Sequence, residues 1–304
     1  MPSILYRGLR YLICRTWSLL HPRAIAWRHI KKRHLNKPII TRLGEDLKVR
    51  IYPHDVIGEP IYVNGMFEPA ECKFVMNFLK PGMLFFDIGA NLGQYTLIAA
   101  QRVTKAGKVH SFEPSPRMFA ELEFNVALNN FTDVCVLNRF AVADKPGRAN
   151  LSRYEPGKEV YSSLGSHTRT EGAIIGYYDI ETITLDEYVA KSGISHLDLI
   201  KMDIEGAELL ALHGGERVLS RTEAPAIVLE MADINTVGFG YQATEIWDYL
   251  EMLGYHMYCF DKHGRISGLA QRPFDFSKAQ NLVALKTSPA VVHSQQYNRV
   301  ARTC

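Results

Sequence analysis

The residues with the clearest chemical potential form a glycine-containing turn between a predicted strand and a predicted helix. The strand candidate Met83 to Asp87 runs almost directly into Gly89, Asn91 and Gly93. Glycine lets the backbone approach a ligand and adopt torsions that side chains resist, and asparagine is among the few other residues that tolerate a positive φ. This turn is therefore suited to hold a nucleotide-like ligand at the end of the strand.

An acidic residue follows at the distance expected for a nucleoside site. Glu113 ends the next strand candidate, Lys108 to Glu113, about twenty residues beyond the turn. A glycine turn alone is weak support, because helix–strand packing also requires glycine. The acid strengthens the case, since a carboxylate can accept hydrogen bonds from both ribose hydroxyls of a nucleoside bound across the strand ends.

Asp87 distinguishes between the nucleosides that such a turn could hold. A carboxylate at the first turn would repel the pyrophosphate of NAD. It would attract or tolerate the cationic sulfonium and α-amino groups of S-adenosylmethionine. We therefore expect S-adenosylmethionine as the cofactor.

Three further acids lie at the ends of later strand candidates. Asp203 ends the candidate Leu197 to Asp203 and is followed by Glu205, and Glu230 lies near the end of Ala226 to Met231. Ligands of open α/β sheets collect at these carboxyl ends. The acids are candidates for a general base that takes a proton from a bound substrate. As oxygen ligands they could instead hold Mg²⁺, which would lower the pKa of the substrate and orient it.

Other polar residues near this region have simpler interpretations. Glu208 is interpreted as a first-turn helix carboxylate favoured by the macrodipole, and His213 as a surface or packing residue within a helix. Tyr161, Ser162 and Ser163 are candidate contacts of the substrate that accepts the transferred group.

The elements that must position these residues alternate between strands and helices, as in βαβ units with a parallel sheet. Helices are predicted over residues 95–103, 117–129 and 207–220, and two later strands, 255–260 and 281–285, are predicted to pair antiparallel. The parallel strand candidates span residues 83–87, 108–113, 134–138, 197–203 and 226–231.

One segment interrupts this alternation. Residues 146–180 are rich in Gly, Ser, Tyr and charge, and we interpret them as an insertion over one end of the sheet and a candidate lid. The predicted organisation is a basic, partly helical arm over residues 1–50, a catalytic domain over 51–286 and a polar mobile tail over 287–304.

Composition bounds the class of protein. With 304 residues, 47% of them hydrophobic and 22% charged, the chain can build one large globular domain, which excludes disorder of the whole chain. Its five scattered cysteines include no CxxC pair and indicate reduced thiols in a cytoplasmic protein. The longest N-terminal apolar runs stop well short of the ~20 residues of a membrane span.

The positive charge is concentrated at one end of the chain. Residues 1–50 contain twelve Lys or Arg and two acids, although the net charge of the chain is only +3. Within them, residues 3–20 place apolar side chains at helical spacing between arginines, which predicts a basic amphipathic helix. Residues 1–40 could therefore contact a membrane surface or nucleic acid, or form a solvated face.

Several blocks taken together closely resemble the FkbM-family methyltransferases. They occur in the order and spacing of the family from about Glu59 to Tyr258, and they are Asp87 to Gly93, Phe112 to Ser115, Ile183 to Asp186 and Asp198 to Glu208. The resemblance implies an α/β class I methyltransferase fold. Such a fold is a Rossmann-like, mostly parallel seven-stranded sheet with an antiparallel last strand and helices on both faces.

The resemblance also assigns roles to individual residues. The methionine part of the cofactor is expected near the glycine turn, the ribose at Glu113 and the adenine near residues 137–142, while Glu68 faces the cofactor pocket. The candidate cofactor contacts are Glu68, Asp87, Gly89, Asn91, Gly93, Glu113, Pro114, Asn138 and Ala141.

The function implied by the resemblance is S-adenosylmethionine-dependent O-methylation of a hydroxyl on a sugar, glycolipid or polyketide-like acceptor. Nucleic-acid methylation is an alternative suggested by the basic arm, weakened by the lack of an Asn-Pro-Pro-Tyr-type motif. A third interpretation is an inactive methyltransferase-like domain that binds membrane surfaces. No sequence feature indicates an oligomeric state.

Overall fold

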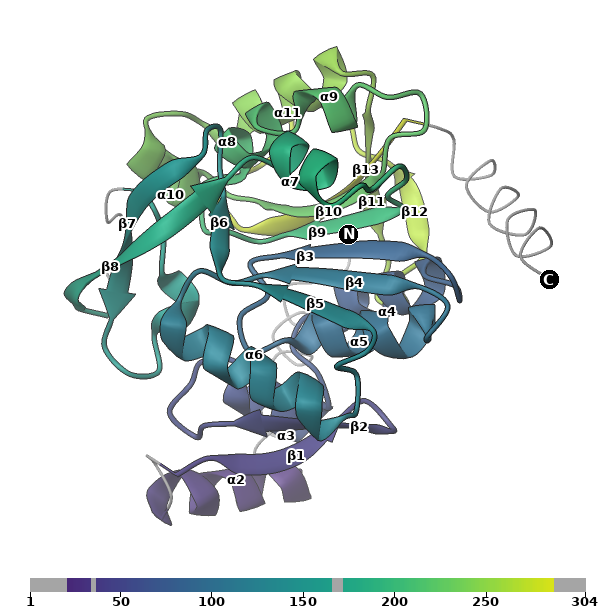
Figure 1. Cartoon of the computed structure of the whole chain (residues 1–304). Helices are drawn as coiled ribbons and strands as arrows, with labels where there is room; N and C mark the ends of the chain where they lie inside the picture. The colour runs from purple at the N-terminus through teal and green to yellow at the C-terminus, as the bar shows by residue number, and fades with distance from the viewer. Residues whose placement is uncertain (1–20, 34–36, 166–171, 287–304) are drawn as a thin grey trace, which may run out of the picture. The chain divides into compact units, whose positions relative to one another are not determined.

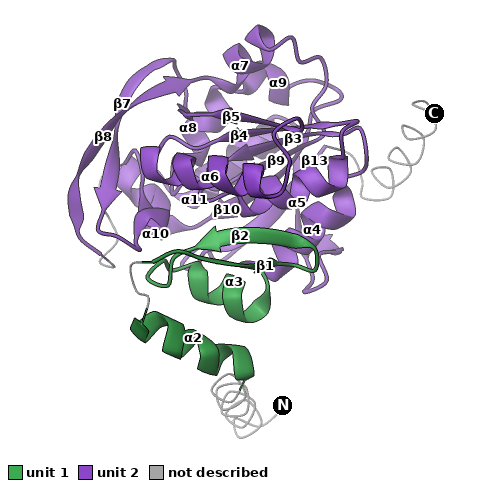
Figure 2. Cartoon of the chain, turned by 60° about the horizontal axis from the view of Figure 1, so that its bottom comes forward, with its two compact units in different colours: residues 1–67 green, residues 68–304 purple. Residues whose placement is uncertain are grey.

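The computed structural model describes residues 21–33, 37–165 and 172–286 and divides the chain into two units (Figure 2). Unit 1 ends at Phe67 and unit 2 begins at Glu68. The sequence placed the start of the second domain at residue 51, but the hairpin over residues 39–51 packs with the helix over residues 58–64 and belongs with it to unit 1. The helix predicted over residues 3–20 and the tail predicted from residue 287 lie outside the described residues.

The described part of unit 1 contains α2 (Pro22–Arg33), the antiparallel strands β1 (Ile39–Leu43) and β2 (Leu47–Ile51), and α3 (Gly58–Asn64). The side chain of Trp27 is 1% exposed, and its ring centroid lies 5.1 Å from that of Tyr62. A Cβ on Gly58 would lie 3.2 Å from this indole, so the absence of a side chain there lets the tryptophan pack closely. This buried contact joins α2 to α3.

The core of unit 2 is an eight-stranded sheet whose strands are β3 (Leu84–Ile88), β4 (Lys108–Phe112), β5 (Cys135–Asn138), β9 (Leu199–Met202), β10 (Ala226–Met231), β11 (His256–Phe260), β12 (Ile266–Leu269) and β13 (Gln280–Leu285). Their order is β12-β11-β13-β10-β9-β3-β4-β5 (Figure 1). The five strands from β10 to β5 are parallel, and β13 is antiparallel to both of its neighbours. This confirms the predicted class I fold, to which the edge strand β12 is an addition.

Helices cover both faces of this sheet (Figure 1). One face carries α4 (Pro69–Phe78), α5 (Gln94–Val103) and α6 (Pro116–Leu128), and the other carries α7 (Leu185–Lys191), α8 (Glu208–His213), α9 (Glu216–Leu219) and α11 (Ala243–Met252). All residues of β9 and all but one of β10 are buried, as expected for strands covered on both sides. No helix within the described ranges is long and apolar enough to cross a membrane.

The helix predicted over residues 207–220 is interrupted, and its two parts are α8 and α9. The interruption falls at Gly214 and Gly215. A Cβ on Gly214 would lie 2.1 Å from the carbonyl oxygen of Ala143, and one on Gly215 would lie 2.7 Å from the side chain of Leu185. Both glycines are therefore required by close packing against neighbouring segments.

The segment interpreted as an insertion contains regular structure. The strands β6 (Phe140–Val142), β7 (Gly147–Tyr154) and β8 (Ile174–Ile183) form a second sheet in the order β6-β8-β7, with the short helix η1 (Glu159–Tyr161) between β7 and β8. Burial alternates along β8, as in a strand with one solvated face. The glycine, tyrosines and charged residues of β8 hide this two-residue alternation in the sequence. We call residues 147–183 the insertion.

Candidate functional site

The turn after β3 contacts the loop after β9 at the carboxyl ends of the parallel strands. Gly89 and Asn91 have φ values of 86° and 52°, which confirms that this asparagine adopts a left-handed conformation. A Cβ on Gly89 would lie 1.9 Å from the carbonyl oxygen of Asp203. Only glycine fits between the two segments, so the turn and the loop form one surface.

Glu113 connects the glycine turn to the loop after β4. Its side chain is 7% exposed, and its two carboxylate oxygens accept hydrogen bonds of 2.8 Å from the backbone amides of Asn91 and Ser115. Burial raises the pKa of Glu113 to about 7, although the two backbone donors lower it. The carboxylate is thus rigidly held where both loops meet the pocket.

A pocket of about 590 Å³, open mouth included, lies among these turns, the loop after β9 and the insertion. The insertion contributes an apolar wall that includes Leu151, Val160 and Leu164. The predicted cofactor and catalytic residues that line the pocket are Gly89, Asn91, Glu113, Pro114, Ala141, Asp203 and Glu205. The structure therefore gathers most of the predicted site at one place.

Asp87 lies beneath the turn instead of lining this pocket. It is 1% exposed and accepts a hydrogen bond of 2.6 Å from the hydroxyl of Thr96, whose oxygen lies 2.7 Å from that of Ser111. Burial raises the pKa of Asp87 to about 6, while the Thr96 hydrogen bond lowers it. This carboxylate therefore supports the turn from inside, and its contact with the methionine part stays a prediction.

Gly93 and Asn138 have similar supporting positions. A Cβ on Gly93, the N-cap of α5, would lie 2.7 Å from the side chain of Leu122. The side-chain amide of Asn138 donates to the carbonyl oxygens of Ser111 and Val136, at 3.1 and 3.2 Å. Both residues are used for packing or hydrogen bonding between elements, and neither lines the pocket where a cofactor contact was predicted.

Glu68 belongs to a network beside the pocket. It has a φ of 47°, and its carboxylate accepts hydrogen bonds from the Tyr95 hydroxyl at 2.7 Å and the Asn281 amide at 3.0 Å. Lys201 is 1% exposed and donates to Asp203 at 3.3 Å and to Asn281 at 3.4 Å. Burial by itself lowers the pKa of Lys201. The nearby carboxylates raise this pKa by more than burial lowers it, so it lies above the ordinary value for lysine. This cation therefore offsets part of the negative charge of the site.

Sequence reasoning missed Lys201, Tyr95 and Asn281. Lys201 offered a signal, because it is a cation within an otherwise apolar strand, and lysine is rarely buried unless it is paired. Tyr95 and Asn281 offered none, since an aromatic residue in a helix and an amide at a strand end have many ordinary roles. Their contribution depends on contacts between segments far apart in the sequence.

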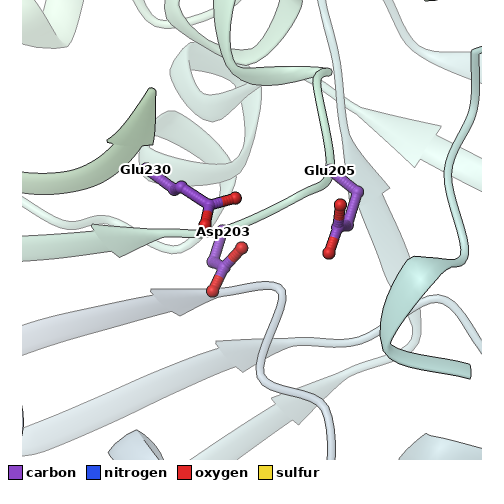
Figure 3. Close-up of side chains that lie close together, drawn as sticks. All are labelled: Asp203, Glu205 and Glu230. Atoms are coloured by element: carbon purple, nitrogen blue, oxygen red, sulfur yellow. The ribbon is translucent and has the colours of Figure 1, made fainter. Parts of the chain in front are cut away.

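Figure 3 shows that Asp203, Glu205 and Glu230 approach the same space. One carboxylate oxygen from each lies within 4.8 Å of the others. Asp203 and Glu205 belong to the loop after β9, whereas Glu230 is part of β10 and accepts a hydrogen bond of 2.8 Å from the Asn235 amide. All three predicted catalytic residues therefore come together, and we call them the acid cluster.

The loop carrying Glu205 is held by the insertion and by the segment after β10. Glu205 has a φ of 51°, and its carbonyl oxygen accepts a hydrogen bond of 2.7 Å from the hydroxyl of Ser163. Ser163 is itself fixed, since its amide donates to the Ser152 hydroxyl at 2.9 Å. A Cβ on Gly206 would lie 2.2 Å from the carbonyl oxygen of Asn235. Contacts on two sides thus maintain a backbone conformation that costs of order 1 kcal/mol for a residue with a side chain.

Protonation of Glu230 should be visible in the pH dependence of stability. Burial, followed by the charges of Asp203 and Glu205, raises the pKa of Glu230 from 4.5 to about 9. The folded protein therefore retains a proton that the unfolded chain releases, and stability from this group falls as the pH rises from about 4.5 to 9. Glu230→Gln cannot ionise, so its melting temperature should rise relative to wild type by roughly several degrees across that window.

Thermal melts of both proteins over this pH range provide the measurement. Glu123→Gln is a matched control, because Glu123 is exposed on α6 and its replacement should leave the pH dependence unchanged. A difference between Glu230→Gln and wild type that is constant at every pH would contradict the assignment.

Glu208 and His213, which the sequence analysis interpreted as structural residues, both contact neighbouring segments of the fold. Glu208 is the first residue of α8, as predicted, and is 2% exposed; its carboxylate accepts a hydrogen bond of 3.0 Å from the amide of Ile204 in the preceding loop, so it ties that loop to the helix. The ring of His213 packs edge-on at 4.5 Å from a tyrosine of α11. Of the insertion residues predicted to meet the acceptor, Ser162 and Ser163 line the pocket.

The strand order, the antiparallel β13 and a pocket at the carboxyl ends of β3, β4 and β9 together define a class I methyltransferase fold. Residues 87–257 match the methyltransferase FkbM domain family, and the chain belongs to this family. The matched region contains the glycine turn, Glu113 and the acid cluster. Membership implies S-adenosylmethionine as the cofactor.

Three curated relatives show how far the similarity extends. The chain is 29% identical to the 2-O-methyltransferase NoeI of Sinorhizobium fredii over 47% of this chain and 61% of that protein. It is 30% identical to the 31-O-demethyl-FK506 methyltransferase FkbM of Streptomyces tacrolimicus over 45% and 61%. It is 29% identical to the hexuronic acid methyltransferase AglP of Haloferax volcanii over 53% and 57%. The chain thus spans about three-fifths of the length of these relatives.

Proposed function

We propose that this chain transfers a methyl group from S-adenosylmethionine to a hydroxyl oxygen of a sugar, glycolipid or polyketide-like acceptor. The observation that carries the proposal is the position of Asp203, whose carbonyl oxygen packs on the glycine turn and whose carboxylate belongs to the acid cluster. A group able to take a proton thus lies beside the segment suited to the cofactor. The names of the relatives, which include a 2-O-methyltransferase, an FK506-related methyltransferase and a hexuronic acid methyltransferase, support the acceptor class.

The residues around the turn fit the adenosine of this cofactor. Glu113 retains lone pairs beyond its two backbone hydrogen bonds, and these can accept from ribose hydroxyls. Gly89 lets the backbone come close to the ligand, while Pro114 and Ala141 offer apolar surface for a purine ring. The bound cofactor would supply a methyl group on a positively charged sulfur.

The acid cluster supports a division of roles in which Asp203 accepts the hydroxyl proton during or near transfer. Burial and the charges of Asp203 and Glu205 raise the pKa of Glu230 to about 9, so Glu230 keeps its proton at neutral pH and can donate a hydrogen bond. The Lys201 ammonium, 3.3 Å from the Asp203 carboxylate, orients that base. Glu205 then completes the polar wall facing the acceptor.

Mg²⁺ held by the acid cluster is the alternative for the same residues. Their oxygens are close enough for shared coordination. However, the Lys201 ammonium lies 3.3 Å from the Asp203 carboxylate and already compensates its charge. We therefore favour proton transfer without a metal. Loss of turnover on chelation, with recovery on adding Mg²⁺ alone, would support the metal instead.

Ser163→Ala should lower kcat about tenfold while leaving the affinity for S-adenosylhomocysteine unchanged. The variant lacks the 2.7 Å hydrogen bond that holds the backbone of Glu205 and therefore the direction of its side chain. Initial rates and calorimetric titration provide the two measurements. Ser163→Thr retains a hydroxyl and is the matched control. An unchanged kcat in Ser163→Ala would mean that the insertion does not position this acid.

The proposed function is tested by incubating the protein with S-adenosylmethionine and a panel of methyl glycosides, lipid-linked sugars and hydroxylated macrolactones. We expect S-adenosylhomocysteine to form with at least one of them, together with the mass of the methylated product. Methylation of RNA or DNA in place of these compounds would favour the nucleic-acid alternative. Failure to bind S-adenosylhomocysteine would reject the proposed function and favour an inactive methyltransferase-like domain.

A further inference from the structure

Unit 1 holds a concentration of positive charge that the proposed function does not use. Residues 21–67 contain nine lysines and arginines against four acids, although the net charge of the whole chain is only +3. Every residue assigned above to the cofactor, the acceptor or the acid cluster belongs to unit 2. The arrangement of these cations on unit 1 therefore calls for a separate explanation.

The outer face of α2 is basic and includes an exposed isoleucine. Ala24 and Trp27 are buried, which defines the packed side of the helix. Arg28 and Lys32 are exposed and lie three and seven residues after Ile25, which is 40% exposed, so the three side chains share one face. We call Ile25, Arg28 and Lys32 the α2 face.

The hairpin of β1 and β2 repeats this combination on a different scaffold. Leu47, Val49 and Ile51 are buried, so the alternate residues of β2 point to the other side of the hairpin. The register pairs Ile40 with Arg50 and Arg42 with Lys48, which gathers three cations and one isoleucine on that side. Ile40 is 54% exposed. We call Ile40, Arg42, Lys48 and Arg50 the hairpin face.

We propose that the α2 face and the hairpin face bind the surface of an anionic lipid bilayer. Lysine and arginine side chains are attracted by anionic headgroups, and a branched aliphatic side chain among them can enter the boundary between headgroups and acyl chains. Each face combines both features. Nucleic acid fits less well, because its phosphate backbone would use the cations alone and offers no apolar region for the exposed Ile25 and Ile40.

The proposal is tested with the full chain by co-sedimentation with vesicles. Wild type should bind phosphatidylcholine vesicles that contain phosphatidylglycerol, should bind pure phosphatidylcholine weakly, and should lose affinity as salt is added. Replacing Arg28, Lys32, Arg42 and Lys48 together by glutamine should weaken binding to the anionic vesicles by more than about tenfold. Ile40→Ser alone should weaken it several-fold while retaining the salt dependence.

The matched control removes the same charge from unit 2. Lys105, Lys145, Lys262 and Lys278 are exposed there, and replacing all four by glutamine should leave vesicle binding close to that of wild type. Equal losses in the two quadruple variants would overturn the proposal, because the effect would then follow net charge alone. So would equal binding to neutral and anionic vesicles, or an RNA fragment that binds more tightly than anionic vesicles at the same salt concentration.

The quadruple variant of unit 1 should still bind S-adenosylhomocysteine with wild-type affinity, since no pocket residue is altered. Retained calorimetric binding therefore serves as the test that unit 2 is folded. A chain that binds anionic vesicles but not S-adenosylhomocysteine would leave this proposal standing and reject the proposed function. A chain that binds S-adenosylhomocysteine but not anionic vesicles would reject this proposal and leave the proposed function standing.

Discussion

Glu113→Ala is expected to weaken the binding of S-adenosylhomocysteine by about 100-fold. Two hydrogen bonds from ribose hydroxyls to a charged carboxylate together contribute about 3 kcal/mol or more, and alanine removes both acceptors. The carboxylate also holds the amides of Asn91 and Ser115, so its loss loosens the two loops that meet at the pocket. Both effects act in the same direction, and isothermal titration calorimetry would measure their sum.

The pH dependence of binding provides a sharper form of this prediction. Because burial raises the pKa of Glu113 to about 7, the free protein carries a mixture of both forms near neutrality, and the ionised form is the stronger acceptor for hydroxyl donors. The affinity of wild type for S-adenosylhomocysteine should therefore rise as the pH increases through about 7. Glu113→Gln keeps one carbonyl acceptor, so it should bind with intermediate affinity that does not follow this change.

Controls distinguish loss of the ribose contact from loss of structure. Glu123→Ala removes an exposed carboxylate from α6 and should bind as wild type does. NAD should not bind to any of these proteins. If Glu113→Ala melted as wild type does and retained wild-type affinity, the ribose site would have to lie elsewhere in the pocket.

Asp203→Asn is expected to lower kcat by about 10²- to 10⁴-fold, which is the usual contribution of a general base. Asparagine has nearly the same shape as aspartate but cannot accept the proton. The loop should keep its position, because the contact with Gly89 involves the backbone of residue 203, not its side chain. S-adenosylhomocysteine binding should therefore change by no more than a few-fold, which calorimetry beside initial-rate assays would establish.

Two further substitutions define the role of Asp203 within the acid cluster. Glu230→Gln imitates a carboxylic acid that already holds its proton, so at neutral pH it should retain most of the turnover. Asp144→Asn replaces an exposed acid in the loop between β6 and β7 and should leave kcat unchanged. Near-normal turnover in Asp203→Asn, or a larger loss in Glu230→Gln, would move the base from Asp203 to another group.

Predictions from the sequence were most successful for the parallel strands and the turn after β3. The runs at residues 84–88 and 226–231, each apolar except for one acid, correspond to strands buried on both faces, where most residues must be apolar. The insertion was harder to predict. The tyrosines and charges of β8 belong to the solvated face of a small sheet, and a strand of this kind resembles a loop when its partner strands are unknown.

The candidate site likewise contains some features that the sequence predicts and others that it does not. Gly89, Asn91 and Glu113 could be selected because a turn and the end of a neighbouring strand obey spacing rules along the chain. Asp87 satisfies the same rules, yet its carboxylate turns inward to Thr96. Chain spacing specifies which strand end a residue occupies. It does not specify whether the side chain points into the pocket or beneath it.

The sequence by itself therefore determined the fold class, the family and the edge of the sheet where the chemistry must lie, because these follow from local periodicity and from motifs a few residues long. Only the tertiary structure decided that Lys201 is buried between Asp203 and Asn281, that Ser163 holds the backbone of Glu205, and that Glu230 reaches both acids. Apart from the contact between Lys201 and Asp203, these contacts join segments separated by tens of residues. Their electrostatic consequences depend on burial and on distances of a few ångströms, which exist only once the chain has folded.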